Sequence, residues 1–202
     1  MTHSMPSHRL ALLSLFLSGV LSGCASAPPL ATVPQLNLDR YMGTWYVIGH
    51  IPPFLTDDAY NAVESYRRGQ DSRVEVLFTY NKGAFDGPAK TLEPTAFTDQ
   101  GTLPSEWGMR FIWPLKSDFR ITYVDDDYQL TIVARNRRDY VWIMARDPVI
   151  SPDTYQELVD RVGQMGYNTA AIRKVPQQAR ALRDDSAHQR YLAQPRVPAK
   201  QT

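Results

Sequence analysis

Two-residue alternation of apolar and polar side chains runs through most of the chain and limits its fold more than any other feature. Turn-forming residues divide it into eight stretches, at 44–51, 59–68, 73–81, 89–99, 106–114, 118–125, 127–135 and 139–146. A period of two puts alternate side chains on opposite faces, as in β-strands with one buried face. The short connections around residues 126 and 137 indicate antiparallel neighbours in chain order.

A meander of this kind has two unpaired edges unless the sheet closes on itself. Closure into a barrel pairs both edges, so the sequence predicts an all-β protein built as an eight-stranded, antiparallel, up-and-down barrel. The interior of such a barrel is either filled by side chains or holds one small ligand. Pro94 interrupts the fourth stretch. Because proline has no N–H to donate, we expect a bulge or an edge there.

The apolar period becomes helical after residue 150. Ser151 is a suitable N-cap, Pro152 suits the first helical position, and Gly166 is typical of a helix end. One α-helix over 151–166 is therefore predicted, packed outside the barrel, and a short extended stretch at 168–175 follows it. The tail at 176–202 is polar and charged. We expect this tail to be poorly ordered, with a short helix around 177–193 as the alternative.

The N-terminal residues indicate export and lipidation. A short segment ending in Arg9 precedes an apolar run at 10–21, which is shorter than the ~20 residues of a membrane-spanning helix and matches a secretory signal. "LSGC" (residues 21–24) resembles the lipobox of bacterial lipoproteins. The resemblance implies a signal peptide at 1–23, acylation of Cys24 and a lipidated tether at 24–37. A plain signal peptide with an incidental cysteine is the alternative.

Composition and motifs argue against several classes of function. Lys plus Arg number 22 and Asp plus Glu 21, so the chain lacks the basic surplus of nucleic-acid-binding proteins. Cys24 is the sole cysteine, so no internal disulfide can form. Nucleophile-elbow, zinc-protease and phosphate-loop motifs are absent. We therefore predict no enzyme, no metal site and no cofactor. His50 is interpreted as a strand-end residue, and Asp125–Asp127 as a solvated hairpin turn.

Aromatic residues on alternating strand positions are the candidate ligand-binding residues. They are Phe78, Tyr80, Trp107, Phe111, Trp113, Phe119, Tyr123 and Trp142. Small-molecule cavities are mostly apolar, so these side chains could line a pocket. A solid packed core and an outward face covered by the helix remain open, because a one-residue error in register inverts the face. Arg135, Arg137 and Arg138, in a turn at the same end, could meet a lipid phosphate.

Three motifs in order carry a family resemblance. They are "LDRYMGTWYVI" (38–48), which contains Gly-x-Trp, "DDDYQLTIVA" (125–134) and "YVWIMAR" (140–146). The chain resembles the lipocalins over residues 38–175, and most closely the outer-membrane lipoprotein lipocalins of bacteria. The resemblance implies that Trp45 plugs the closed end of the barrel, that Arg146 packs over it, and that Gly43 lets the chain turn into the first strand.

The same resemblance implies a function and a location. The expected ligand is a fatty acid or a lysophospholipid, bound for storage or transport in the cell envelope. The acylated N-terminus would anchor the protein in the outer membrane, with the barrel in the periplasm. The alternative is a filled-barrel lipoprotein that binds a protein partner through its loops or tail.

Overall fold

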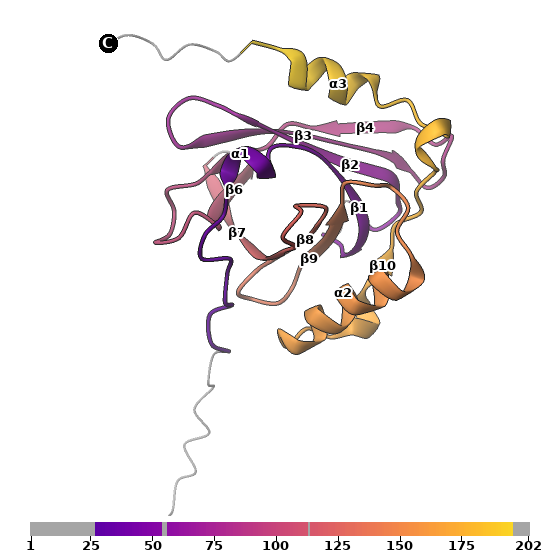
Figure 1. Ribbon diagram of the computed structural model, residues 1–202. Coiled ribbons are helices and arrows are strands. Elements are labelled where there is room, and N and C mark those ends of the chain that lie inside the picture. Colours follow the sequence, from indigo (N-terminus) through magenta and orange to yellow (C-terminus); the bar gives the residue numbers. More distant parts are fainter. Residues whose placement is uncertain (1–26, 54–55, 113, 196–202) are drawn as a thin grey trace, which may run out of the picture.

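The strands form one closed antiparallel barrel, which Figure 1 shows along its axis. The computed structural model describes residues 27–53, 56–112 and 114–195. Neighbouring strands follow in chain order, and the last pairs with the first: β1 (Gly43–Ile51), β2 (Ala59–Arg68), β3 (Arg73–Lys82), β5 (Thr95–Phe97), β6 (Glu106–Ile112), β7 (Leu115–Val124), β8 (Leu130–Ala134) and β9 (Val141–Ala145). The predicted eight-stranded, antiparallel barrel is confirmed.

The fourth predicted strand is split in two at Pro94. Its first part, β4 (Ala89–Leu92), pairs with residues 78–81 of β3, and its second part, β5, pairs with residues 73–75. Of these two parts, β5 pairs with β6. Among the residues that the structure describes, no pairing joins β4 to β6. The missing N–H of proline explains the break, and it leaves the barrel wall unpaired beside β4.

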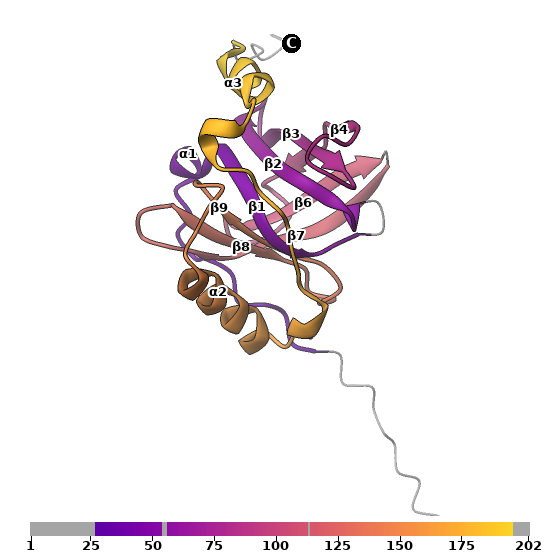
Figure 2. The same cartoon turned by 90° about the vertical axis from the view of Figure 1, so that its right-hand side faces the viewer.

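Helix α2 (Pro152–Gln164) packs on the outside of the barrel, as predicted (Figure 2). It begins at Ser151, whose side chain accepts a hydrogen bond from the backbone N of Thr154 at 3.0 Å. Its buried residues Leu158 and Val162 lie against outward-facing residues of β8 and β9. The short strand β10 (Arg173–Lys174) then pairs with β1. Strands β8 and β9 therefore bury apolar side chains on both faces, one towards the barrel interior and one towards α2.

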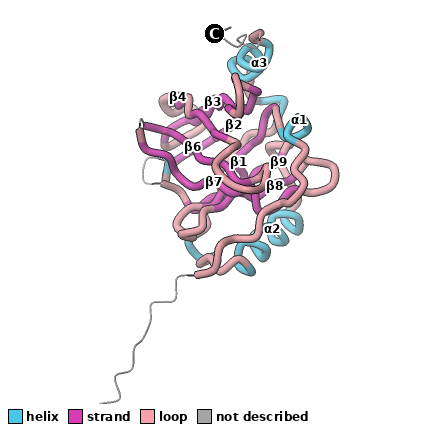
Figure 3. The backbone as a smooth tube through the Cα atoms, turned by 90° about the vertical axis from the view of Figure 1, so that its left-hand side faces the viewer, coloured by secondary structure: helices cyan, strands magenta, loops and turns pink. Residues whose placement is uncertain are grey.

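The C-terminal tail contains regular structure where disorder was expected, in agreement with the alternative of a short helix around 177–193. Residues 176–193, here called the C-terminal segment, contain the 3-10 turn η3 (Arg180–Leu182) and helix α3 (Ser186–Ala193). Together with α1 (Leu38–Tyr41) and α2 this gives three α-helices in the described residues, all outside the strands (Figure 3). The sequence predicted α2 and gave a short helix in the tail as an alternative. A further 3-10 turn, η2 (Thr169–Ala171), follows α2.

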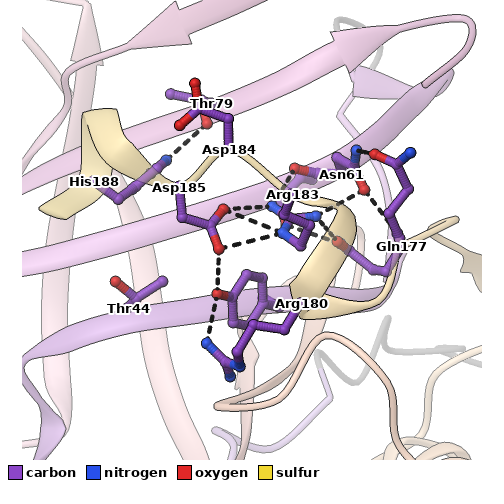
Figure 4. Close-up of polar contacts among 12 residues, drawn as sticks. Thr44, Asn61, Thr79, Gln177, Arg180, Arg183, Asp184, Asp185 and His188 are labelled. Atoms are coloured by element: carbon purple, nitrogen blue, oxygen red, sulfur yellow. Dashed lines mark hydrogen bonds and ion pairs between the residues drawn. The ribbon is translucent and has the colours of Figure 1, made fainter. Parts of the chain in front are cut away.

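Polar pairing holds the C-terminal segment on the barrel (Figure 4). Arg183 donates a hydrogen bond to the side-chain oxygen of Asn61 at 2.7 Å, and the His188 ring lies 2.7 Å from the Thr79 hydroxyl on β3. Within the segment, Arg183 also donates to Gln177 at 2.7 Å and pairs with Asp185 at 3.1 Å. Asn61 belongs to β2. Polar composition suggested a solvated tail, but the outer faces of β2 and β3 supply polar partners for it.

The predicted tether also packs on the barrel where the structure describes it. Leu30 and Leu36 are buried. The backbone N of Val33 donates to the carbonyl oxygen of Ile121 at 3.0 Å, and Ser105 donates to that of Val33 at 2.6 Å. The expected signal peptide and the lipidation site Cys24 lie outside the described residues. No helix in the described ranges is both long and apolar enough to cross a membrane.

Candidate functional site: an apolar pocket in the open half of the barrel

Trp45 and Arg146 close one end of the barrel. The Trp45 side chain is fully buried and donates from its indole nitrogen to the carbonyl oxygen of Tyr41 at 2.9 Å. The Arg146 guanidinium carbon lies 3.7 Å from the centroid of the Trp45 ring, the contact that the resemblance implied. Gly43 has a φ of +98°, and a Cβ there would lie 3.2 Å from an Arg146 nitrogen. Glycine is therefore required at this turn.

Aromatic rings fill the closed half of the barrel above this plug. The Trp107 ring centroid lies 5.6 Å from that of Tyr41, 6.0 Å from that of Tyr66 and 5.9 Å from that of Phe119. Trp107 is 1% exposed, and its indole nitrogen donates to the carbonyl oxygen of Pro104 at 2.7 Å. Trp107, a candidate ligand-binding residue, is therefore part of the packed core below the pocket.

A cavity of about 260 Å³ occupies the open half. Small-molecule pockets typically measure roughly 300–1,000 Å³, so this one lies just below that range. Four of the eight aromatic candidates line it: Phe78, Phe111, Phe119 and Trp142. Further lining residues include Pro53, Thr56, Leu92, Pro94 and Tyr140, together with the charged residues Glu64, Glu93, Asp118 and Arg135. Part of the predicted aromatic face is thus open space, while the rest is core.

Three of the other four candidates lie elsewhere. Tyr80 is buried in the interior cluster, with its ring centroid 5.4 Å from that of Phe78, but it does not line the pocket. Trp107 is in the core, and Trp113 lies outside the described residues. Tyr123 was expected on the same face as Phe119, but it packs under α2 with the Arg161 guanidinium carbon 4.3 Å from its ring centroid. The pairing register of β7 shifts between Ile121 and Tyr123, and this irregularity inverts the face.

The pocket reaches the wall where β4 and β6 are unpaired. Leu92 and Pro94 line it from one side of this gap and Phe111 from the other. Phe111 is 49% exposed, although it belongs to a strand whose alternate residues Trp107 and Met109 are buried. The gap is therefore a route between the pocket and the surface that is mostly apolar, with the exposed Glu93 beside Leu92 and Pro94.

A buried acid in the pocket was not predicted from the sequence. Glu64 lines the pocket at 8% exposure and accepts a hydrogen bond from the Tyr66 hydroxyl. Burial raises the pKa of the Glu64 carboxyl to about 7. The sequence did contain an indication of it, because Glu64 is a charged residue that alternates with Ala62 and Tyr66 on the buried face of β2.

Of the three arginines in the turn between β8 and β9, one reaches the pocket. Arg135 lines it, with its Nε 3.4 Å from a carboxylate oxygen of Asp139. Arg138 instead donates to the carbonyl oxygens of Met165 at 2.9 Å and Pro28 at 2.7 Å. The Arg137 side chain is 80% exposed. Of the three arginines that could meet a lipid phosphate, only Arg135 is therefore placed in the pocket.

Two other polar features have structural explanations. His50 is buried, and this burial lowers the pKa of its imidazole to about 4, so the ring is neutral at neutral pH. One carboxylate oxygen of Asp125 accepts from the backbone N of Gln129 and of Leu130, both at 2.7 Å. The Asp125–Asp127 stretch thus forms the hairpin turn that was predicted.

Sequence comparison identifies relatives of this barrel. A family model described as a lipocalin-like domain matches residues 36–177. The chain is 28% identical over 156 residues to temperature-induced lipocalin-1 of Arabidopsis thaliana, covering 73% of this chain and 83% of that protein. It is 24% identical over 152 residues to outer membrane lipoprotein Blc of Escherichia coli (strain K12), covering 73% of this chain and 84% of that protein.

Solved structures share the architecture. Insecticyanin from the tobacco hornworm Manduca sexta superimposes with a TM-score of 0.57 at 13% sequence identity, over 80% of this chain and 88% of that one. At this identity the likeness concerns the fold alone. The family model, by contrast, spans well over half of the sequence, and the chain belongs to the lipocalin family.

Proposed function

We propose that this protein binds a small hydrophobic ligand, a fatty acid or a lysophospholipid, and stores or transports it in the cell envelope without catalysing a reaction. The apolar pocket with its opening between β4 and β6 is the observation that carries this proposal. Burial of apolar surface drives such binding, at roughly 25 cal/mol per Å². The pocket disfavours the alternative of a filled barrel, and the similarity to outer membrane lipoprotein Blc agrees with an envelope role.

Arg135 is the candidate partner for an acidic head group. It lines the pocket at the open end, and a guanidinium forms strong paired hydrogen bonds with carboxylate or phosphate oxygens. A single chain would then lie with its tail among Phe78, Phe119 and Trp142 and its head near the turn between β8 and β9.

Phe111→Ala is expected to weaken the binding of a single-chain lipid about tenfold, because the lost ring contact contributes about 1.4 kcal/mol. Its effect on the free energy of unfolding is expected to stay within about 1 kcal/mol, since half of the ring is exposed in the free protein. Titration of lysophospholipid against intrinsic tryptophan fluorescence measures the first quantity, and urea unfolding measures the second.

Leu115→Ala is the matched control for this variant. Leu115 is also exposed and begins the neighbouring strand β7, but it does not line the pocket. We expect its affinity for lipid to equal that of the wild type. Equal losses in both variants would show that the ligand does not enter this pocket.

We further propose that an acylated Cys24 holds the open end of the barrel near the membrane. Pro28 and Leu30 hydrogen-bond to Arg138 and Asn136, which lie in the turn between β8 and β9 at the open end. Four residue steps separate Cys24 from Pro28, and they span at most about 14 Å. The pocket would then open close to the lipid surface that supplies its ligand.

Cys24→Ser is expected to move the protein from the membrane fraction to the soluble fraction. A photo-crosslinking residue at position 137, in the open-end turn, is expected to label lipid in membranes. The same residue at position 71, in the turn between β2 and β3 at the other end, is not. Equal labelling at both positions would contradict the proposed orientation.

A further inference from the structure

Glu64 is an acid within an apolar row that crosses the barrel wall. In the pairing register it lies opposite Trp45 on β1 and opposite Phe78 on β3, and Phe78 lies opposite Leu92 on β4. Directly opposed residues in an antiparallel sheet project from the same face. The Glu64 carboxyl therefore faces the interior among residues that pack the core or line the pocket.

The carboxyl is only partly satisfied by the protein. Its Oε2 accepts from the Tyr66 hydroxyl, and within the described part of the chain no other hydrogen bond or ion pair is made by Glu64. Burying a carboxyl costs free energy that hydrogen bonds to its oxygens offset, so the second oxygen of Glu64 remains available to a partner from outside the chain. Because Glu64 lines the pocket, that partner would be a bound ligand.

We propose that Glu64 is the polar recognition point of the pocket, and that it favours an amphiphile whose inserted end donates a hydrogen bond, a hydroxyl or an amine, over one that would insert a carboxylate. The inference rests on the proposed binding of a hydrophobic ligand and specifies its chemistry. A hydroxyl can donate to Oε1, and an ammonium adds an ion pair. A carboxylate beside Glu64 meets a like charge, so a fatty acid enters tail first, with its head near Arg135.

Among the groups packed around it, Glu64 is the one whose pKa lies near neutral pH. Burial raises the pKa of Tyr66 on β2 and of Tyr41 on α1, and burial lowers the pKa of Arg146 only to about 10. His50 on β1 remains neutral because burial lowers its pKa to about 4. Trp45 and Phe78, the direct neighbours across the sheet, carry no charge. The other charged groups lining the pocket are Glu93, Asp118 and Arg135.

This arrangement gives the selectivity a pH dependence. Above its pKa of about 7 Glu64 is a carboxylate and pairs with an ammonium, whereas below it the neutral acid offers a hydrogen bond only. An alkylamine is therefore expected to bind more tightly at high pH than at low pH. An alkanol of the same length carries no charge and is expected to change little.

The test uses three probes that share one alkyl chain: dodecylamine, dodecanol and dodecanoate. Each displaces the neutral apolar dye N-phenyl-1-naphthylamine from wild-type protein at about pH 8 and about pH 5.5, which lie on either side of the Glu64 pKa. At the higher pH the amine and the alcohol are expected to bind at least about fivefold more tightly than dodecanoate. The amine is expected to lose at least about threefold at the lower pH. This pH comparison needs no variant.

Glu64→Gln and Glu93→Gln form the matched pair of variants. Both remove an acid that lines the pocket, but Glu93 is exposed. Glu64→Gln keeps an oxygen that can accept from Tyr66, and we expect it to fold and bind the dye. It is expected to abolish the pH dependence of dodecylamine binding and the preference for amine over dodecanoate, whereas Glu93→Gln keeps both.

Two results would overturn the inference in distinguishable ways. If the wild type binds the dye and all three probes with the same preference as Glu64→Gln, Glu64 does not select the ligand, while the proposed function stands. If the wild type binds neither the dye nor any probe, the proposed function fails together with the inference.

Discussion

Arg146→Ala is expected to lower the free energy of unfolding by about 3–4 kcal/mol, the largest effect among the substitutions considered. The guanidinium donates hydrogen bonds to the backbone carbonyl oxygens of Thr44 at 2.7 Å and of Arg40 and Met42 at 2.8 Å. It also covers the Trp45 ring. Alanine leaves the part-buried carbonyl oxygens of Thr44 and Met42 without this donor and uncovers the plug at the closed end. Urea unfolding followed by tryptophan fluorescence measures the loss.

Arg146→Lys and Arg137→Ala are the controls for this expectation. Lysine keeps the positive charge, but its ammonium cannot reproduce the planar set of donors, so an intermediate loss is expected. Arg137 lies in the turn between β8 and β9 at the opposite, open end, with a largely exposed side chain, and its removal is expected to change stability by no more than about 0.5 kcal/mol. A loss below about 1 kcal/mol for Arg146→Ala would contradict a structural role for this contact.

Acidification is expected to weaken the attachment of the C-terminal segment through His188. The ring lies within hydrogen-bonding distance of the Ser65 hydroxyl at 2.8 Å and the Thr79 hydroxyl at 2.7 Å, and it is 3% exposed. Burial lowers the pKa of His188 from 6.5 to about 4. The unfolded chain therefore takes up a proton below about pH 6.5, whereas the folded protein does so only near pH 4.

The protein therefore loses stability as the pH falls from 6.5 towards 4. By about pH 5, the free energy of unfolding is lower by about 2 kcal/mol because of His188. His50 contributes in the same direction, because its pKa is also lowered. Glu64 contributes in the opposite direction, since its raised pKa makes the folded protein bind a proton first as the pH falls through about 7. Only a comparison with a variant isolates the contribution of His188.

His188→Gln is that variant, with Gln189→Ala as its neighbour on the same helix. Glutamine cannot take up a proton, so the difference in free energy of unfolding between about pH 7.5 and about pH 5 is expected to shrink by about 2 kcal/mol. Gln189 is exposed on α3, and its replacement is expected to leave the pH profile of the wild type. Identical profiles for wild type and His188→Gln would contradict the burial of the His188 ring between α3 and strands β2 and β3.

The barrel could be predicted because its local signals agree with one another. Alternation marks each strand, and the Ser151 and Pro152 pair marks the start of α2. The C-terminal segment could not be predicted in this way. Its partners, Asn61, Ser65 and Thr79, are distant in sequence and polar, so neither period nor hydrophobicity indicates the contact.

The site was predictable only in part, because a cavity and a core have the same composition. Trp107 and Trp142 both occupy inward positions, yet Trp107 is packed among aromatic rings and Trp142 faces open space. The prediction for Tyr123 was wrong because a single irregularity in the register of β7 turns its side chain to the outer face. Glu64 was visible as a charge on a buried face, but its meaning depends on the pocket beside it, which only the three-dimensional arrangement reveals.

Native mass spectrometry tests most directly whether the barrel is an open, ligand-binding pocket. The sample is protein beginning at Ala25, produced in a bacterial host and purified without detergent. The account predicts an adduct that denaturation releases, with the mass of a single-chain amphiphile, and one bound molecule per chain when such lipids are added to stripped protein. A bare mass, with no uptake of fatty acid or lysophospholipid in excess, would contradict it.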